Sequence, residues 1–200
     1  MKDLVLLVAD KNAQFALKGA LERPTALGIR PVTFDFIVHP EHDGGVRKTG
    51  PDIIGLARQR FSHAFLVMDF EGSGSADEAS VLESRLDSRL QAAWQNRAKA
   101  IVIEPEVDVW MWGSDNAIRD AVEWPHRGSI REWLERNGFE FQDNDKPIRP
   151  KESLEAILKE SNQPRSSAIY LRIASQISLR RCTDFAFQRL RQQLINWFPE

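Results

Sequence analysis

The stretch HAFLVMD, residues 63–69, is a short apolar run that ends in an acid. The same pattern occurs in DLVLLVAD, residues 3–10, and in AKAIVIE, residues 98–104. Apolar runs of this length, with β-branched residues among them, are typical of strands buried on both faces of a parallel sheet. Alternating apolar residues in PVTFDFIV, residues 31–38, predict one more strand.

Helical patterns separate these four strands. Residues 12–23 carry apolar side chains at helical spacing, with Asn12 as the expected N-cap, and residues 51–60 predict a short helix. Ser75 to Glu78 fits a capping box, so a helix of about five turns should follow it. The alternation predicts an α/β fold: a central parallel sheet of about four strands with helices on both faces.

Two other parts of the chain have different patterns. Residues 39–45 combine proline, aspartate and two glycines, which predicts a long loop. After residue 105 only helical patterns occur, over residues 106–112, 129–137, 151–161, 165–177 and 184–198. We therefore expect an α/β domain at residues 1–113 and a helical C-terminal subdomain, residues 114–200, packed on it, with residues 142–150 as the linker candidate.

Composition excludes several classes of protein. The 200 residues are 42% hydrophobic and 28% charged, with a formal net charge of −2, as in ordinary globular proteins. No apolar run approaches the roughly 20 residues that cross a bilayer, so we expect no membrane association and a cytoplasmic location. The single cysteine, Cys182, excludes an internal disulfide and a multi-cysteine zinc site.

Acids follow three of the four predicted strands. Asp10 follows the first, Asp69 and Glu71 the third, and Glu106 and Asp108 the fourth. Open α/β sheets bind ligands at the carboxyl ends of their strands, and an extended segment would point Asp69 and Glu71 to the same side. Converging carboxylates repel one another unless a cation neutralises them, so the pattern predicts a Mg²⁺ or Mn²⁺ site. The alternative is that each acid is solvated or caps the next helix.

Basic residues supply candidates for contact with nucleic-acid phosphates. Residues 146–200 contain ten Lys and Arg but five Asp and Glu, although a solvated helix face would show the same bias. We expect Lys151, Arg180 and Arg181 to lie on one exposed face. The nucleic-acid-binding candidates near the strand-end loops are Lys11, Arg47 and Lys48.

A family resemblance is carried by the segments LLVADKNAQFALKGAL, LVMDFEGSGS and IEPEVDVWMWG. Together they resemble the TOPRIM fold, the metal-binding domain of topoisomerases and primases, over about residues 1–113. More narrowly, with RPKESLEAIL and LRRCTDFAFQRL included, the chain resembles the TOPRIM-like component of bacterial methylation-associated anti-phage defence systems. The resemblance implies catalytic acids at Asp10, Asp69 and Glu71, and metal ligands at these three together with Glu106 and Asp108.

The resemblance also implies a function. It is that of a defence-system component, a divalent-metal-dependent, nuclease-like protein that cleaves nucleic-acid phosphodiesters, with DNA and other defence proteins as partners. Two departures bear on activity, because Asp10 stands where TOPRIM proteins carry Glu, and Gln14 stands at the position of a second acid. The departures favour a noncatalytic TOPRIM-like scaffold as the alternative. A second alternative is a receiver-like regulator phosphorylated on Asp69.

Overall fold

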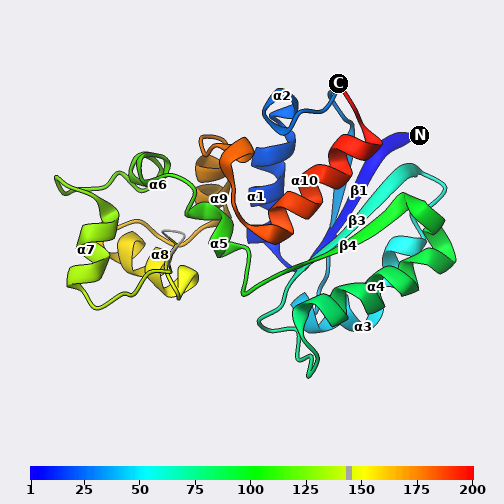
Figure 1. Ribbon diagram of the computed structural model, residues 1–200, viewed down its shortest axis with the longest axis horizontal. Coiled ribbons are helices and arrows are strands. Elements are labelled where there is room, and N and C mark those ends of the chain that lie inside the picture. Colours follow the sequence, from blue (N-terminus) through cyan, green and yellow to red (C-terminus); the bar gives the residue numbers. More distant parts are fainter. Residues whose placement is uncertain (143–145) are drawn as a thin grey trace.

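A computed structural model describes residues 1–142 and 146–200. Its centre is one sheet of four strands, in the order β2-β1-β3-β4, in which every neighbouring pair is parallel (Figure 1). The strands are β1 (Lys2–Val8), β2 (Phe34–Val38), β3 (Phe61–Asp69) and β4 (Ala98–Ile103). The predicted α/β fold with a parallel sheet of four strands is confirmed.

The central strands divide their side chains between two apolar cores. In β1, Leu4 and Leu6 face one core, whereas Val5 and Leu7 face the other. All four side chains are at most 1% exposed. This period of two explains why the central strands are apolar at nearly every position, since both faces of the sheet must be covered.

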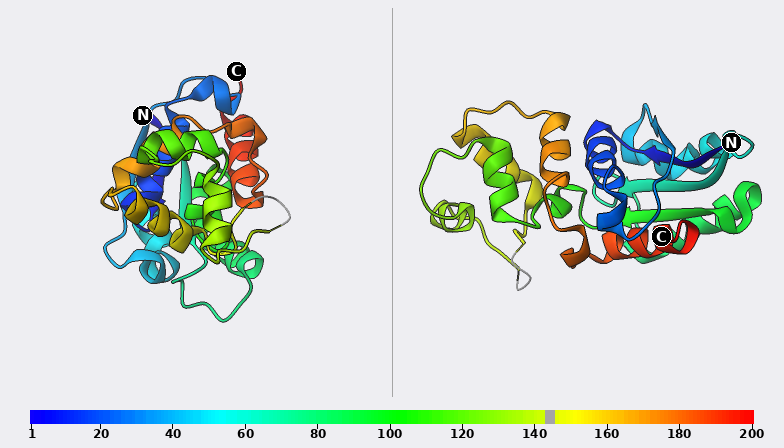
Figure 2. Two further views of the ribbon diagram at one scale, coloured as in Figure 1. Left: turned by 90° about the vertical axis from the view of Figure 1, so that its left-hand side faces the viewer. Right: turned by 90° about the horizontal axis from the view of Figure 1, so that it is seen from above.

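Helices cover both faces of the sheet (Figure 2). One face packs against α3 (His42–Gly55) and α4 (Ala79–Trp94). The other face packs against α1 (Lys11–Leu21) and α10 (Phe185–Trp197), where Trp197 stacks on His63 of β3 with ring centroids 4.7 Å apart.

The chain beyond β4 is helical, as expected. Its α-helices are α5 (Asp108–Met111), α6 (Asp115–Val122), α7 (Ile130–Arg136), α8 (Pro150–Glu160), α9 (Ser167–Ala174) and α10. The short helices that complete the described chain are α2 (Pro24–Leu27) and the 3₁₀ turns η1 (Gln95–Arg97) and η2 (Leu179–Arg181).

The helical part meets the sheet part through shared apolar packing. Helices α6, α7 and α8 form the end of the molecule away from the sheet, whereas α9 lies against α1 (Figure 1). A Cβ added at Gly19 of α1 would lie 2.8 Å from Cβ of Ala174, so glycine is needed for this close approach. The division at residue 113 stays a prediction, and the linker candidate includes residues 143–145, which lie outside the described residues.

The loop expected at residues 39–45 is wrong, because α3 begins within it at His42. A Cβ added at Gly45 would lie 2.3 Å from Cε1 of His39, so the glycine allows close packing inside a helix. At this position glycine is needed because a side chain would clash with His39, and not because the backbone forms a turn.

Two predicted caps are also wrong. Asp10, not Asn12, is the N-cap of α1, and α4 begins at Ala79 after the N-cap Glu78. The Ser75 hydroxyl instead accepts a hydrogen bond from the N–H of Asp77 at 3.2 Å. The sequence analysis also missed α6, which lies in a polar stretch that follows Gly113. In the described part of the chain, no helix has the length and apolar character needed to cross a membrane.

Candidate functional site

The carboxyl ends of β1, β3 and β4 bring acids from distant parts of the sequence together. Because β1 and β3 are neighbours at the centre of the sheet, Asp10 and Asp69 lie at the same edge. The segment after β4 adds Asp108, and the first turn of α3 adds Asp43. The carboxyl of Asp69 interacts electrostatically with those of Asp43, Asp10 and Asp108. We call these four residues, with Glu106, the strand-end cluster.

Asp69 is at the centre of the strand-end cluster. Desolvation raises its pKa well above the usual range, and the negative charges of Asp43, Asp10 and Asp108 raise it further. Its Oδ1 accepts a hydrogen bond from the N–H of Val107 at 2.9 Å, which orients the carboxyl group. Asp10 and Asp69 therefore lie close enough for their carboxyl charges to interact, whereas their binding of one cation stays a prediction.

Asp43 is a member of the strand-end cluster that the sequence analysis missed. Its Oδ1 accepts a hydrogen bond from the N–H of Asp69 at 2.7 Å, so α3 is joined to the end of β3. Burial raises the pKa of Asp43, and the nearby charge of Asp10 adds to the rise. In the sequence, Asp43 is followed by two glycines, which predicted a loop. The helix that carries Asp43 in its first turn was therefore not recognised.

Asp10 serves the fold as well as the strand-end cluster. Its Oδ1 accepts a hydrogen bond from the N–H of Ala13 at 2.8 Å and so caps α1. An N-cap of this type satisfies an N–H group that has no partner within the helix. The interpretation of Asp10 as a helix cap is therefore confirmed. Its negative charge also raises the pKa values of Asp69 and Asp108.

Asp108 connects the cluster to the helical part of the chain. It is buried in α5, and its Oδ1 accepts a hydrogen bond from the hydroxyl of Tyr170 in α9 at 2.7 Å. Burial raises the pKa of Asp108, whereas Tyr170 and the positive charges of Arg165 and Lys151 oppose the rise. Nη2 of Arg165 lies 3.4 Å from the Tyr170 hydroxyl oxygen.

Glu106 is buried beside these aspartates, and among the described residues it has the one direct contact between the strand-end cluster and a cation. Its Oε2 lies 3.4 Å from Nζ of Lys151 at the start of α8. Desolvation and the charge of Asp108 raise the pKa of Glu106 to about 7, although Lys151 opposes the rise. A carboxyl group with this pKa changes its charge near neutral pH.

Glu71 differs from Asp69 in its surroundings. β3 ends at Asp69, and Glu71 lies in a turn with an exposed side chain. The premise that the two residues share one extended segment is therefore wrong. Glu71 still contributes a negative charge that raises the pKa of Glu106.

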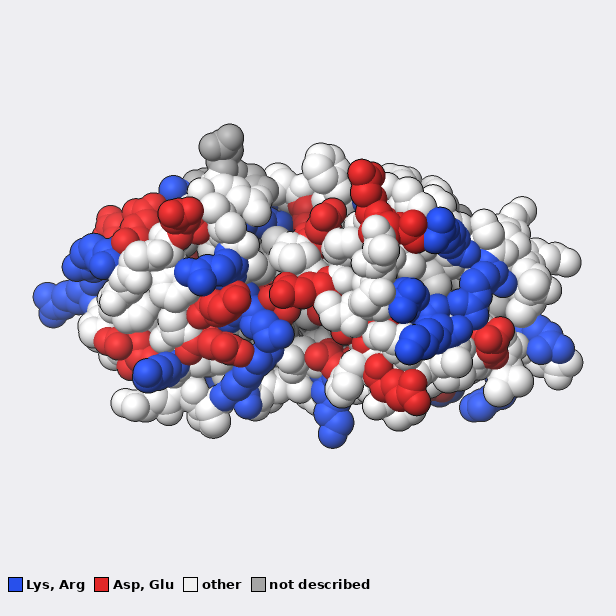
Figure 3. Space-filling model, turned by 90° about the horizontal axis from the view of Figure 1, so that it is seen from below, with Lys and Arg blue, Asp and Glu red and all other residues white. Residues whose placement is uncertain are grey.

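The six basic candidates do not form one group. Lys11 is the exposed first residue of α1, the Arg47 guanidinium lies beside Gly74, and Lys151 contacts Glu106. Lys48 is exposed on α3. Figure 3 shows acidic side chains in the middle of one face of the molecule, with Lys, Arg and further acids toward both ends.

Arg180 and Arg181 lie elsewhere, in η2. Nη2 of Arg180 donates to the carbonyl oxygen of Thr25 in α2 at 2.9 Å. Asp10 caps the N-terminal end of α1, whereas α2 follows its C-terminal end, so Arg180 contacts the end of α1 that is opposite the strand-end cluster. The single exposed face expected for Lys151, Arg180 and Arg181 is not found.

The oxygens of the strand-end cluster limit how a metal ion could bind. Within residues 1–142 and 146–200, no three His, Cys, Asp or Glu side chains form a group that could hold a metal ion. Asp10, Asp69 and Asp108 each use Oδ1 in a hydrogen bond, which leaves Oδ2 of each as the available ligand. These residues fit a hydrated cation held by one or two carboxylates, as Mg²⁺ often is, and not a cage of protein ligands alone.

Comparisons with known proteins give no independent assignment. No protein-family model matches the chain, and no curated protein or solved structure matches it either.

Proposed function

We propose that this protein binds a hydrated Mg²⁺ or Mn²⁺ at the strand-end cluster and uses it to cleave nucleic-acid phosphodiesters, as a component of bacterial anti-phage defence. The defence role rests on the resemblance of the sequence to TOPRIM-like defence proteins. The chemistry rests on one observation: Asp69 lies among three other carboxylates that raise its pKa, and among the described residues its carboxyl group accepts one hydrogen bond, from a backbone N–H. A divalent cation would remove that repulsion.

The residues at the site fit distinct roles in this proposal. Asp69 and Asp10 would hold the cation through their Oδ2 atoms, with Glu71 and Asp108 acting through bound water. The cation would supply charge stabilisation at a nonbridging phosphate oxygen. Lys11 and Lys151 would offset the charge of the bound phosphate. Glu106, whose pKa is raised to about 7, would exchange a proton with water at the site.

Metal binding is tested by thermal unfolding with and without Mg²⁺ or Mn²⁺. A cation that binds the folded state raises the melting temperature of the parent protein. Asp69→Asn should abolish that rise, whereas Asp87→Asn should keep it, because Asp87 is a carboxylate already paired with Lys99. A parent protein without any metal response would contradict the metal site.

Cleavage is tested by incubating modified and unmodified DNA with the protein and Mg²⁺ or Mn²⁺. We expect cleavage that EDTA and Asp69→Asn both abolish, and that Lys151→Gln reduces about tenfold because a phosphate contact is lost. Sequence preference should be absent, or set by DNA modification, because no base-reading motif occurs in the sequence.

A second candidate, a noncatalytic TOPRIM-like scaffold, is favoured by the state of Asp10. Its Oδ1 is engaged as the cap of α1, and Gln14, one turn later, has no negative charge. The scaffold predicts DNA binding that EDTA leaves unchanged, with no cleavage in either metal. The receiver-like alternative has no specific contact in its favour and stays a prediction of the sequence analysis.

A further inference from the structure

A second site lies away from the strand-end cluster, where η2 and the start of α10 meet. A pocket of about 530 Å³ is present there, within the range of cavities that bind small molecules. Arg180, Arg189 and Arg191 line it, together with Phe185, Gln188 and Gln192. No aspartate or glutamate of the described chain lines this pocket.

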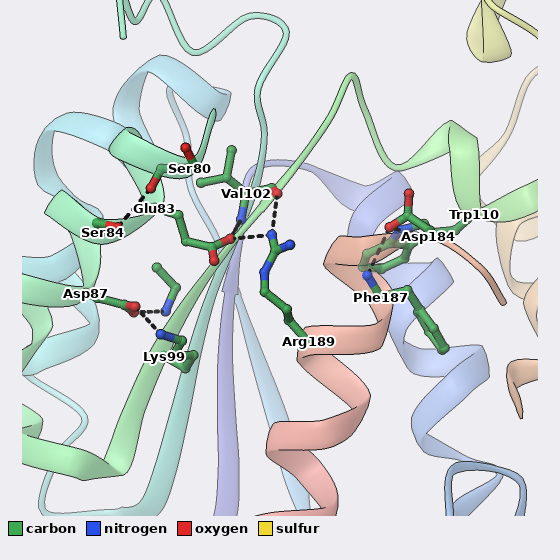
Figure 4. A network of polar contacts seen from close by, with 11 residues as sticks. Ser80, Glu83, Ser84, Asp87, Lys99, Val102, Trp110, Asp184, Phe187 and Arg189 are labelled. Atoms are coloured by element: carbon green, nitrogen blue, oxygen red, sulfur yellow. Dashed lines mark hydrogen bonds and ion pairs between the residues drawn. The ribbon is translucent and has the colours of Figure 1, made fainter. Parts of the chain in front are cut away.

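The three arginines differ in what they contact. Arg189 donates to Oε2 of Glu83 at 2.8 Å, which fixes its guanidinium between α10 and α4 (Figure 4). The Arg180 guanidinium donates to a neutral carbonyl group, that of Thr25. Among the described residues Arg191 has no ion-pair partner, and its Nε is buried without a hydrogen bond. The pocket therefore has two guanidinium groups, those of Arg180 and Arg191, that form no ion pair with any described residue.

An aromatic side chain stands beside these charges. Phe185 is 78% exposed and is the one aromatic residue among the exposed large hydrophobic residues of the described chain. It also lines an adjoining pocket of about 440 Å³, so it separates two hollows. An exposed ring beside arginines provides a flat apolar surface on which a nucleic-acid base can stack.

Two amide side chains complete the wall of the pocket. Gln188 and Gln192 are four residues apart on α10, so they lie on one face of the helix. Both are exposed, and each donates a single hydrogen bond at its amide, at 3.3 Å and 3.1 Å. Amides of this kind can hydrogen-bond to the edge of a base.

We propose that this pocket binds a nucleoside phosphate, either as a free nucleotide or as part of a single strand. Arg180 and Arg191 contact the phosphate, Phe185 stacks on the base, and Gln188 contacts the base edge. The exposed ring and the paired amides favour this ligand over an acidic peptide, which needs the arginines alone. The inference goes beyond the proposed function and needs no metal ion at the strand-end cluster.

The test is fluorescence anisotropy with a labelled single-stranded DNA of about eight nucleotides, a length within the usual site size. EDTA is present, so that a metal site contributes nothing. We expect saturable binding that weakens about tenfold or more in the Arg180→Gln, Arg191→Gln double variant, because two phosphate contacts are lost. Arg172→Gln is the matched control, since Arg172 is an exposed arginine of α9 outside the pocket, and it should weaken binding less than about twofold.

Phe185→Ala separates stacking from charge. Loss of a stacking ring should weaken binding about tenfold while leaving the salt dependence unchanged. Competition then distinguishes the two sources of the ligand. Displacement of the strand by AMP, but not by inorganic phosphate, identifies a nucleotide site, whereas displacement by longer strands alone identifies a single-strand site.

The proposal is overturned if the strand does not bind, if Arg172→Gln weakens binding as much as the double variant, or if Phe185→Ala has no effect. Thermal unfolding of each variant checks that it is folded. Asp87→Asn, at a carboxylate outside both sites, should leave binding in EDTA unchanged. Failure of the pocket is thereby distinguished from failure of the strand-end cluster, because the first is measured without metal and the second only with it.

Discussion

Two groups of carboxylates lie beside β4, and they differ in what surrounds them. Glu83 and Asp87 of α4 lie along the edge of the strand, whereas the strand-end cluster lies beyond its carboxyl end. We call Glu83 and Asp87 the edge pair. The carboxylates of the edge pair have hydrogen-bond donors and cations as partners. The carboxylates of the strand-end cluster have mostly one another as neighbours.

The edge pair accepts hydrogen bonds from backbone N–H groups of β4. Oε2 of Glu83 accepts from the N–H of Val102 at 2.8 Å, and Oδ1 of Asp87 accepts from the N–H of Ala100 at 2.7 Å (Figure 4). A spacing of four on the helix thus matches a spacing of two on the strand. Because β4 is the last strand of the sheet, these carboxylates occupy sites that an additional strand would use.

The strand-end cluster has few such partners. Its cation contact in the described chain is Lys151 with Glu106, and pKa values are raised at Asp43, Asp69, Glu106 and Asp108. Burial alone does not distinguish the two groups, since Glu83 is 8% exposed and Glu106 is 5% exposed. The difference is in the partners: the edge pair stabilises the fold, and the strand-end cluster retains repulsion that a ligand can relieve.

The largest effect is expected at Glu83. Glu83→Ala removes the acceptor of the Val102 N–H and the partner of Arg189, so the free energy of unfolding should fall by about 3 kcal/mol. Urea denaturation measures the loss. Glu83→Gln keeps an acceptor oxygen and should lose less than half as much. Equal losses in the two variants would show that charge, and not the hydrogen bond to β4, carries the effect.

A substitution at Asp69 is expected to have the opposite effect and to increase the free energy of unfolding. Asp69→Asn keeps an oxygen that can accept from Val107 but removes a charge from the centre of the strand-end cluster. The metal-free variant should therefore be more stable than the parent at pH 7.5, as measured by urea denaturation. A destabilised variant would mean that the cluster is compensated by a partner, and the contrast with the edge pair would be lost.

The fold was predictable because the central strands are buried on both faces. β4 was predicted with its observed bounds, and β1 and β3 within two residues, since uninterrupted apolar runs leave few alternatives. The course of residues 39–45 was not predictable, because glycine is common both in turns and in helices packed closely against a neighbour. Only the tertiary contact of Gly45 with His39 distinguishes the two cases.

The candidate site was predictable in part for the same reason. Parallel strands bring their carboxyl ends to one edge, so the positions of Asp10 and Asp69 followed from the strand pattern. Asp43 could not be found, because it enters from a helix whose start was hidden. Glu71 was misplaced because the strand stops at Asp69, and no periodicity marks where a strand ends.

A smaller effect, dependent on pH, is expected from Glu106. Its pKa is raised from 4.5 to about 7 in the folded protein, so the folded state binds more protons than the unfolded state between these values. Stability of the metal-free protein should therefore fall as pH rises from 4.5 to 7, and the contribution of Glu106 should be about 1 kcal/mol after solvent screening.

Glu106→Gln tests this contribution. Urea denaturation at several pH values should give a flatter profile for the variant than for the parent over that window. The profiles should converge near pH 4.5, where the carboxyl group of Glu106 is neutral in the folded protein and the variant removes no charge. Parallel profiles would place the pH dependence on the other acids of the strand-end cluster.

The smallest effect is expected at Lys99, the cation that pairs with Asp87 of the edge pair. Its ion pair with Asp87 involves side chains that are 37% and 20% exposed, so water screens the attraction. Asp87 would keep its hydrogen bond from the N–H of Ala100 after Lys99→Gln, and β4 would stay covered. The free energy of unfolding should fall by no more than about 0.5 kcal/mol, and less in high salt. A loss comparable with that of Glu83→Ala would mean that cations hold the edge pair in place, whereas a small loss assigns that role to the backbone N–H groups of β4.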